Sequence, residues 1–262
     1  MRNINIKPIQ SVERAIQILC CFKFEKKELT IENIMLETGL TRATVYRLLW
    51  TLEKNGMIQY DSKLHSFRLG YKLLEFGNIV FENLDIGREA ESEIKTLNET
   101  IHQSVILAVR QEDHLQYILR VDSQEGFQPH THVGSRKVLH MGGIGTAMMA
   151  YLPVEQAAGI IDKYPLIQLT PHTLTDTKSY IDRLAEIRSQ GYFVGVEETF
   201  VGFTTIAVPI FDAKGIVTAG LGTIVRSHKL DDESLAEIIN QCKNTAMKIS
   251  RKLGFIESTV LE

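Results

Sequence analysis

The 262-residue chain has only three cysteines, one tryptophan and six prolines, and it contains no long apolar run. Two of the cysteines, Cys20 and Cys21, are adjacent, so the three do not form the disulfide framework of a small secreted domain. No stretch approaches the roughly 18 to 20 apolar residues of a membrane span, and the N-terminus lacks the apolar core of a secretory signal. We therefore expect a cytoplasmic protein with no membrane partner.

The motifs of common catalysts are also missing. The chain has no HExxH zinc motif, no phosphate-binding Gly-Lys-Ser/Thr loop and no nucleophile elbow. The segment GGIGTA begins like a dinucleotide fingerprint, but Thr146 and the residues after it stand where the third glycine belongs. Glu197 and Glu198 are adjacent on a predicted strand, so they point to opposite faces and do not form an acid–base pair. We expect no enzyme, no catalytic residue and no cofactor.

The net charge of −3 conceals an asymmetry along the chain. Residues 1–72 carry 12 Lys and Arg against 7 Asp and Glu, which is a net charge of +5. The remaining residues carry 17 against 25, a net charge of −8. A basic first quarter before an acidic body is typical of a nucleic-acid reader joined to a separate module, although solvated helices also carry surplus lysines.

Three helices are predicted in the first quarter of the chain. SVERAIQILCCF has Ser11 as its expected cap. Its apolar residues recur at helical spacing and are expected to face the core: Val12, Ala15, Ile16, Leu19 and Phe22. In TIENIMLETGL, Thr30 is the expected cap of a short helix and Gly39 ends it. A third helix, capped by Thr41, follows this glycine turn.

The third helix has two faces. Its core face carries Val45, Leu48, Leu49 and Leu52. Its other sides carry small, hydroxyl-bearing and cationic residues: Arg42, Ala43, Thr44, Tyr46, Arg47 and Lys54. Small residues allow close approach to a DNA groove, and arginine forms bidentate hydrogen bonds to guanine or phosphate. A helix, a turn with glycine and a second helix is the unit that places its second helix in the major groove.

A hairpin is predicted in MIQYDSKLHSFRLG, after the breaker Asn55–Gly56. Apolar residues alternate inward on both strands: Ile58, Tyr60, Phe67 and Leu69. Its cations, Lys63, His65 and Arg68, are suited to phosphates beside the groove. An ordinary helical bundle with a surface hairpin is the alternative. Trp50, on the outer half of the third helix, packs either against the hairpin or against a partner subunit.

The rest of the chain predicts a linker helix and an α+β domain with strands between helices. Glycines 142, 143 and 145 open a helix, which either frees backbone N–H groups for an anionic ligand or serves only a tight turn. His130 and His132 in PHTH share one face of an extended segment, a spacing that permits metal chelation. Scattered polar histidines are more common, so no metal is expected.

At five stretches the chain resembles the isocitrate lyase regulator (IclR) family of transcriptional regulators. These are SVERAIQILCCF, TGLTRATVYRLLWTLEKNGMI, FRLGYKLLEFG, LHMGGIGTAMMAYLP and GYFVGVEETFVGFTTIAVPIFDAKGIVTAGLG. The resemblance implies a winged helix-turn-helix DNA-binding domain over residues 1–70, a linker helix over 71–84 and a GAF-like effector-binding and oligomerisation domain over 85–262. It also implies a dimer, or a dimer of dimers, that binds an operator in double-stranded DNA. A small-molecule effector, expected to be an organic acid, controls the affinity of what is expected to be a repressor.

The site residues follow from the motifs and the resemblance together. The residues expected to contact DNA are Thr41, Arg42, Thr44, Tyr46, Arg47, Lys63, His65 and Arg68. The resemblance places effector contacts at Gly143, Ile144, Gly195, Phe203, Thr205, Gly222 and Ile224, with His130 and His132 as candidate anion partners. Relatives that bind small organic acids have an acidic residue in place of Gly195 and serines in place of Gly222 and Ile224. A larger, less polar pocket is therefore expected, suited to an aromatic or sugar-derived acid.

Two other functions compete with a DNA-binding regulator. The first is a metal-dependent sensor or enzyme that uses His130 and His132, and it predicts a bound metal that is lost when both are replaced. The second is a protein-interaction module whose basic hairpin contacts an acidic partner. It predicts no dependence on DNA sequence.

Overall fold

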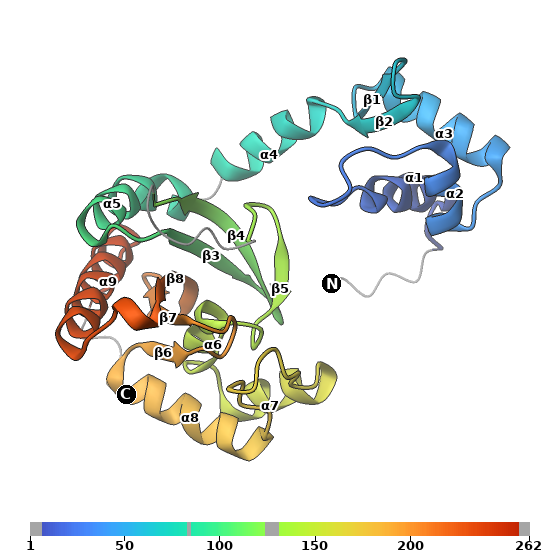
Figure 1. Cartoon of the computed structure of the whole chain (residues 1–262). Helices are drawn as coiled ribbons and strands as arrows, with labels where there is room; N and C mark the ends of the chain where they lie inside the picture. Colours follow the sequence, from blue (N-terminus) through green and yellow to red (C-terminus); the bar gives the residue numbers. More distant parts are fainter. Residues whose placement is uncertain (1–6, 83–84, 124–130, 257–262) are drawn as a thin grey trace. The chain divides into compact units, whose positions relative to one another are not determined.

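The computed structural model describes residues 7–82, 85–123 and 131–256, which form two compact units, residues 1–83 and 84–262 (Figure 1). The first unit contains α1 (Gln10–Cys21), α2 (Ile31–Thr38), α3 (Arg42–Lys54), β1 (Ile58–Asp61), β2 (Ser66–Leu69) and α4 (Lys72–Glu82). Its two strands form an antiparallel hairpin in which Tyr60 lies opposite Phe67. Three helices and a hairpin follow one another as the sequence predicts.

Local capping defines the helix-turn-helix. The Thr30 side chain accepts a hydrogen bond from the backbone N–H of Asn33, and the Asn33 side chain accepts one from Thr30 N, which makes a capping box at the start of α2. Gly39 ends α2 in the left-handed conformation, with φ of 68°. Thr41 is the first residue before α3, as predicted, although its side chain makes no capping hydrogen bond.

The start and the buried face of α1 differ from the prediction. The helix begins at Gln10 after Ile9, so Ser11 is not its cap. Ile18 and Cys21 are buried, whereas Val12 and Ile16 are 52% and 53% exposed. Helical spacing alone did not identify the core face. The apolar surface of α1 is wider than the part of it that α2 and α3 bury.

The core of the first unit lies between α1, α2, α3 and the hairpin. Its fully buried members are Ile18, Leu29, Ile34, Val45, Leu49 and Ile58. Phe67 of the hairpin exchanges backbone hydrogen bonds with Leu29, which ties the hairpin to the segment before α2. Leu69, which alternation places inside, is 45% exposed. A two-stranded hairpin covers a core only where other elements meet it, and β2 meets them at Phe67.

The second unit is built on a six-stranded antiparallel sheet in the order β5-β4-β3-β8-β7-β6. The strands are β3 (Val105–Gln111), β4 (His114–Val121), β5 (Arg136–Val138), β6 (Phe193–Val196), β7 (Phe203–Phe211) and β8 (Val217–Arg226). The longest pairing joins β7 to β8 across the turn DAKG, where the Asp212 carboxylate accepts hydrogen bonds from Lys214 N and Ile216 N. An aspartate whose side chain accepts hydrogen bonds from backbone N–H groups just after it is typical of such turns.

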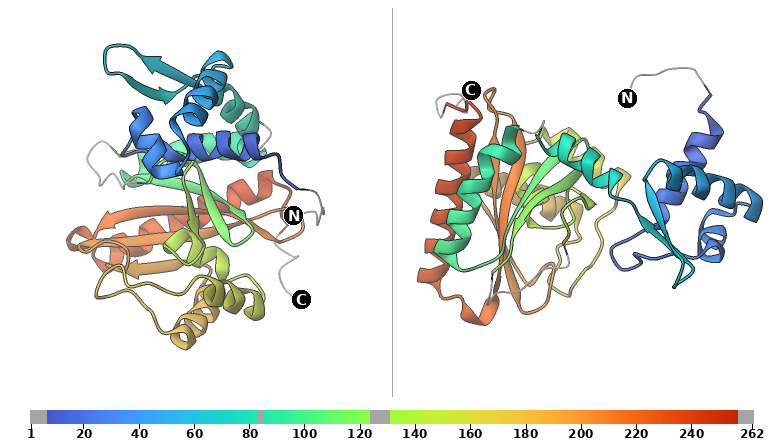
Figure 2. Two further views of the ribbon diagram at one scale, coloured as in Figure 1. Left: turned by 90° about the vertical axis from the view of Figure 1, so that its right-hand side faces the viewer. Right: turned by 90° about the horizontal axis from the view of Figure 1, so that it is seen from above.

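Helices cover both faces of the sheet. One face is covered by α5 (Asp85–Ile101) and α9 (Asp232–Lys252), which lie side by side (Figure 2). The other face is covered by α6 (Gly143–Met149), α7 (Val154–Lys163) and α8 (Thr177–Gln190), and the 3₁₀ turn η1 (Ser227–Lys229) follows β8. The predicted α+β class is confirmed. Within the described ranges, none of the helices combines the length and apolar character that crossing a bilayer requires.

Glycines in β8 bring α6 close to the sheet. A Cβ atom at Gly220 would lie 2.8 Å from Ile144 Cγ2, and one at Gly222 would lie 2.6 Å from Ile144 Cγ1. Both distances are too short for real side chains, so the two glycines leave the room that Ile144 occupies. This close approach places the start of α6 directly over β7 and β8, where the candidate cavity lies.

Candidate nucleic-acid interface and ligand cavity

The outer side of α3 is exposed and cationic. Val45, Leu49 and Leu52 are buried, whereas Tyr46 and Arg47 are exposed. Among the described residues, no carboxylate lies within 4 Å of the Arg47 guanidinium. This side chain is therefore available to a DNA base or phosphate without first breaking an ion pair.

The first turn of α3 is tied to its surroundings. Arg42 Nη1 lies 2.8 Å from Glu32 Oε1 on α2, and both side chains are about two-thirds exposed. Backbone hydrogen bonding and the arginine lower the pKa of Glu32. Thr41 and Thr44 share a hydrogen bond of 3.0 Å between their hydroxyls. Exposed ion pairs of this kind contribute little to the free energy of folding. A DNA phosphate can therefore replace Glu32 as the partner of Arg42.

Three basic side chains are carried by the hairpin. The Asp61 carboxylate accepts hydrogen bonds from Lys63 N and Leu64 N, which fix the turn and lower the pKa of Asp61. His65 has φ of 49° and its Nδ1 lies 3.0 Å from the Tyr60 hydroxyl. Arg68 Nε donates to Gln59 Oε1 at 3.2 Å, and Lys63 is exposed. The turn therefore presents these groups in a fixed arrangement.

Trp50 lies beside the hairpin. It lines a hollow together with Tyr60 and Phe67, and its ring centroid is 5.2 Å from Lys54 Nζ. Yet 57% of its surface is exposed. It also lines a groove between α1 and α3. Contact with the hairpin thus covers less than half of this side chain.

The second unit contains a cavity with two adjoining lobes. The β-lobe lies between the start of α6 and the sheet, and the α-lobe lies on the side of α8. Met141, Gly142, Gly143 and Thr199 line both lobes and separate them. The volume open to the centre of a water molecule is about 40 Å³ in the β-lobe and about 30 Å³ in the α-lobe. A few water molecules fit as the side chains stand, so a larger ligand must displace some of them.

The predicted effector residues are distributed unevenly around this cavity. Five of them line the β-lobe: Gly143, Ile144, Thr205, Gly222 and Ile224. Three described ones line neither lobe: Gly195, Phe203 and His132. Phe203 lies 5.3 Å from the Arg226 guanidinium carbon, and the carbonyl of His132 accepts hydrogen bonds in a turn with Ser135. His130 lies outside the described residues.

The glycines Gly143, Gly195 and Gly222 do not leave open space beside them. A Cβ atom at Gly195 would lie 2.6 Å from Phe193 Cζ, and one at Gly143 would lie 2.7 Å from the same ring. Phe193 therefore fills the room beside Gly143 and Gly195, just as Ile144 fills the room at Gly222. The alternative that glycines 142, 143 and 145 serve a tight turn is supported, since α6 has only seven residues and Gly142 adopts φ of 128°, which strongly favours glycine.

Sequence analysis missed three polar residues of the β-lobe. Lys137, Tyr117 and Thr131 line it, and Arg120 Nη1 holds the Thr131 carbonyl at 2.6 Å. Burial lowers the pKa of Lys137 and raises that of Tyr117 to about 12. The sequence did contain a signal for Lys137. Alternation along RKVL places Lys137 on the same side as the apolar Leu139, which is buried in the structure.

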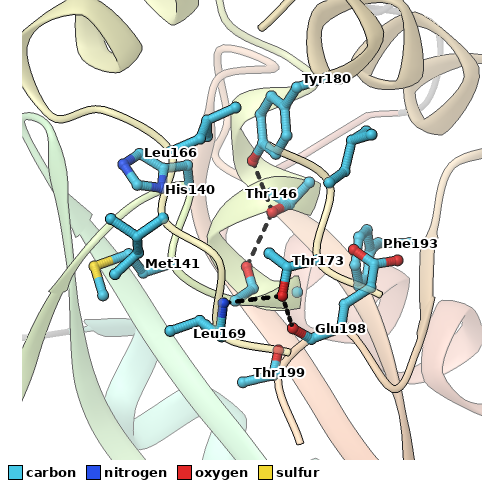
Figure 3. A pocket seen from close by; sticks show the side chains of 14 residues that line it. His140, Met141, Thr146, Leu166, Leu169, Thr173, Tyr180, Phe193, Glu198 and Thr199 are labelled. Carbon is cyan, nitrogen blue, oxygen red and sulfur yellow. Dashed lines mark hydrogen bonds between the residues drawn. The ribbon is translucent and has the colours of Figure 1, made fainter. Parts of the chain in front are cut away.

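Polar side chains line the α-lobe on several sides: His140, Thr146, Tyr180, Thr173, Glu198 and Thr199 (Figure 3). Glu198 Oε2 lies 2.7 Å from Arg183 Nη1, and the Arg183 guanidinium carbon lies 4.7 Å from the centre of the Phe193 ring. Thr173 Oγ1 donates to the Glu198 carbonyl at 2.7 Å. Across the lobe, the Nε2 atom of His140 is buried and has no hydrogen-bond partner among the described residues. Burial lowers the pKa of His140, which favours its neutral form.

A metal centre finds no support in the described residues. No group of three His, Cys, Asp or Glu side chains in these ranges is arranged to hold a metal ion. His132 lines neither lobe, and the described lining of the α-lobe includes no imidazole besides that of His140.

A helix-turn-helix unit with a cationic hairpin, followed by a unit with an internal cavity, defines the class of ligand-responsive transcriptional regulators. Two family models match the chain: the IclR helix-turn-helix domain over residues 11–62 and the bacterial transcriptional regulator IclR C-terminal domain over residues 79–251. The chain belongs to the IclR family. The prediction of a DNA-binding regulator with a C-terminal effector domain, and not an enzyme, is confirmed by this membership. The GAF-like character of that domain stays a prediction.

Relatives match over nearly the whole chain. XynR of Escherichia coli K12, a helix-turn-helix transcriptional regulator, is 31% identical over 94% of this chain and 98% of its own. The transcriptional repressor AllR of the same strain is 29% identical over 95% of this chain and 92% of its own. The fold is similar to that of an IclR homologue from Microbacterium hydrocarbonoxydans solved with 4-hydroxybenzoate, with 20% identity, coverage of 93% and 99%, and a TM-score of 0.84.

Proposed function

We propose that the chain is a repressor that binds its operator as a dimer and leaves it when an organic acid occupies the two-lobed cavity. The exposed side of α3 carries the proposal, because Arg47 has no carboxylate partner among the described residues and stands on the helix that a helix-turn-helix inserts into the major groove. The repressor AllR and the homologue bound to 4-hydroxybenzoate support the direction of control and the effector class. A repressor acts where the chromosome lies, so we also propose a cytoplasmic location.

The proposed interface has a centre and a rim. Arg47, Tyr46 and Thr44 contact base edges or nearby phosphates. Thr41 and Arg42 hold the backbone at the first turn of α3, where Arg42 exchanges Glu32 for a phosphate. Lys63, His65 and Arg68 of the hairpin contact the flanking backbone, since fixed cations beside a groove gain affinity by releasing counterions.

Control by the effector is a coupling between two equilibria. A ligand that binds one arrangement of the dimer more tightly shifts the spacing of the two α3 helices, and α4 is the segment that connects the units along the chain. A change of about 10- to 100-fold in operator affinity corresponds to about 1 to 3 kcal/mol of coupling free energy.

The first test is fluorescence anisotropy of the full-length protein with DNA from upstream of its own gene, against a scrambled duplex. Tight binding to the first duplex only, which falls steeply between about 50 and 200 mM salt, is the expected result. Equal binding to both duplexes, with Arg47→Ala indistinguishable from wild type on genomic fragments, would reject α3 as a reader of DNA.

A second copy of the chain is the proposed partner of the exposed apolar side chains of the first unit. On α1 these are Val12 and Ile16, preceded by Ile9, and on α4 they are Leu74, Phe76 and Ile79. Exposed apolar patches of this kind mark interaction surfaces. A two-fold dimer also matches a partly palindromic operator, in which each half-site takes one α3.

Replacing Ile16 by glutamate is therefore expected to lower the mass of the particle in sedimentation and to weaken operator binding at least tenfold, since a charge enters the apolar contact and one α3 then binds alone. Leu36→Glu on α2 is the matched control, because Leu36 is 85% exposed and lies off α1 and α4. The dimer surface is wrongly assigned if both variants sediment and bind like the wild type.

A further inference from the structure

The β-lobe holds a cation that has no counter-ion among the described residues. Lys137 in β5 pairs with Leu115 of β4, and its Nζ lies 5.9 Å from the centre of the Tyr117 ring. It is half-buried, and it is the only charged side chain among the described residues that line this lobe. In the described ranges, no carboxylate lies within 4 Å of its ammonium group.

Such a cation is costly unless something pairs with it. Moving an ammonium group out of water disfavours its charged form, and burial here lowers the pKa of Lys137 with no opposing contribution from an acid. The other polar lining groups are hydroxyls, including those of Tyr117 and Thr131, which hydrogen-bond without neutralising charge. An anion from outside the described residues can therefore pair with Lys137 and offset this cost.

The α-lobe, in contrast, favours a neutral hydrogen-bonding group over an anion. Its one acidic side chain among the described residues, Glu198, is already paired with Arg183, so this end offers carboxylate, carbonyl and hydroxyl oxygens with little net charge. The buried Nε2 of His140 needs a partner, and a hydroxyl can satisfy it in either tautomer of the ring. A second carboxylate would be repelled by Glu198 there, whereas a hydroxyl can donate to the acceptors.

The partition between the lobes consists of the Gly142–Gly143 backbone and two side chains that can move, those of Met141 and Thr199. Met141 lines both lobes and is half-buried, and an unbranched thioether changes shape at low cost (Figure 3). Thr199, the other side chain of the partition, lies in the loop between β6 and β7. Their displacement joins the lobes into one elongated site, as a ligand larger than a few water molecules requires.

We propose that Lys137 binds the carboxylate of the effector and that a hydroxyl at the other end of the same molecule lies beside the Nε2 atom of His140 in the α-lobe. The effector is then a hydroxy acid, held in one orientation by a charge at one end and a hydrogen bond at the other. This inference rests on the proposed function, because it identifies the ligand class of that same cavity.

Calorimetric titration of the full-length protein tests the assignment with named probes. Two carboxylates, 4-hydroxybenzoate and D-gluconate, are paired with their uncharged counterparts, 4-hydroxybenzamide and sorbitol, and benzoate lacks the distal hydroxyl. The variants are Lys137→Met, which keeps the length of the side chain, and Lys137→Arg, which keeps the charge. Arg136→Met is the matched control, because Arg136 is the exposed neighbour on the same strand and its Nη2 lies 3.1 Å from His114 Nδ1.

At least one of the hydroxylated carboxylates is expected to bind wild type more tightly than its uncharged counterpart. Lys137→Met should weaken its binding about 10- to 100-fold, as for the loss of one charge-assisted hydrogen bond. Lys137→Arg and Arg136→Met should bind the carboxylate with near wild-type affinity. Benzoate should bind more weakly than 4-hydroxybenzoate. A circular dichroism melt equal to that of wild type shows that Lys137→Met is folded. If the variant is not folded, the comparison of charged with uncharged probes on the wild-type protein decides.

The inference is overturned if the carboxylates bind no better than the uncharged probes, if none binds at millimolar concentration, or if folded Lys137→Met binds them like wild type. In that case Lys137 only covers the Tyr117 ring with its apolar stem. Operator binding without ligand is measured alongside. If operator binding is retained while the Lys137 variants bind the carboxylates with wild-type affinity, the inference fails and the proposed repressor stands. Lys137-dependent binding of a carboxylate without operator binding would instead support the ligand site and reject the repressor.

Discussion

Arg47→Ala is expected to weaken operator binding about 5- to 150-fold, which corresponds to about 1 to 3 kcal/mol. Arg47 is exposed on α3, and no acidic side chain of the described residues competes for it. If the guanidinium reads a guanine, affinity falls for the operator and little for scrambled DNA. If it contacts a phosphate instead, affinity falls on both duplexes. The slope of log affinity against log salt concentration then decreases by about one.

Lys27→Ala is the control for the loss of one positive charge. Lys27 is exposed and precedes α2, outside the predicted DNA contacts. It should change the affinity for both duplexes slightly and equally, since a distant charge contributes only through a screened field. Anisotropy titrations of both variants at matched salt make the comparison. An Arg47→Ala protein with wild-type affinity on every duplex would contradict the proposed interface.

Gly145→Ala is expected to destabilise the second unit by about 3 kcal/mol or more. A Cβ atom at this position would lie 1.8 Å from the Leu139 carbonyl oxygen and 2.6 Å from its carbonyl carbon. Both are backbone atoms, so no side chain can turn aside to make room. The segment from Leu139 to the start of α6 must shift, and this segment carries His140 and Met141 of the cavity wall.

Thermal unfolding followed by circular dichroism is the measurement. For a unit of this size, about 3 kcal/mol lowers the melting temperature by about 6 to 12 °C. Gly159→Ala is the matched control, because Gly159 lies inside α7 and a Cβ atom there meets nothing within 4 Å. It should raise stability by about 0.5 to 1 kcal/mol, since alanine favours helix more than glycine does. Equal melting temperatures for Gly145→Ala and the wild type would refute the steric argument.

Local signals in the sequence predicted most elements correctly. Thr30 and Gly39 bound α2 as expected, and the hairpin of β1 and β2 follows Asn55–Gly56. These features depend on residues a few positions apart, because the free energy of a cap or a turn is set by interactions within one turn of the backbone. The helix-turn-helix and its exposed cationic side were predictable for the same reason.

The errors occurred where distant segments meet. The apolar stripe of α1 gave no indication that Ile18 and Cys21 would be covered while Val12 and Ile16 stay exposed, because coverage depends on where α2 and α3 lie. The glycines Gly195 and Gly222 suggested an open pocket. Phe193 and Ile144 fill that room, and Ile144 reaches Gly222 from a helix far earlier in the chain.

The sequence by itself determined the order of elements, the basic first quarter, the residues that face outward on α3 and the membership of a regulator family. These properties follow from periodicity, local turns and motifs, which act over short stretches of chain. Only the tertiary structure decided which side chains enclose the cavity. It placed Lys137 without a counter-ion among the described residues of one lobe and Glu198 beside Arg183 in the other, because burial and charge pairing depend on atoms that are close in space and far apart along the chain.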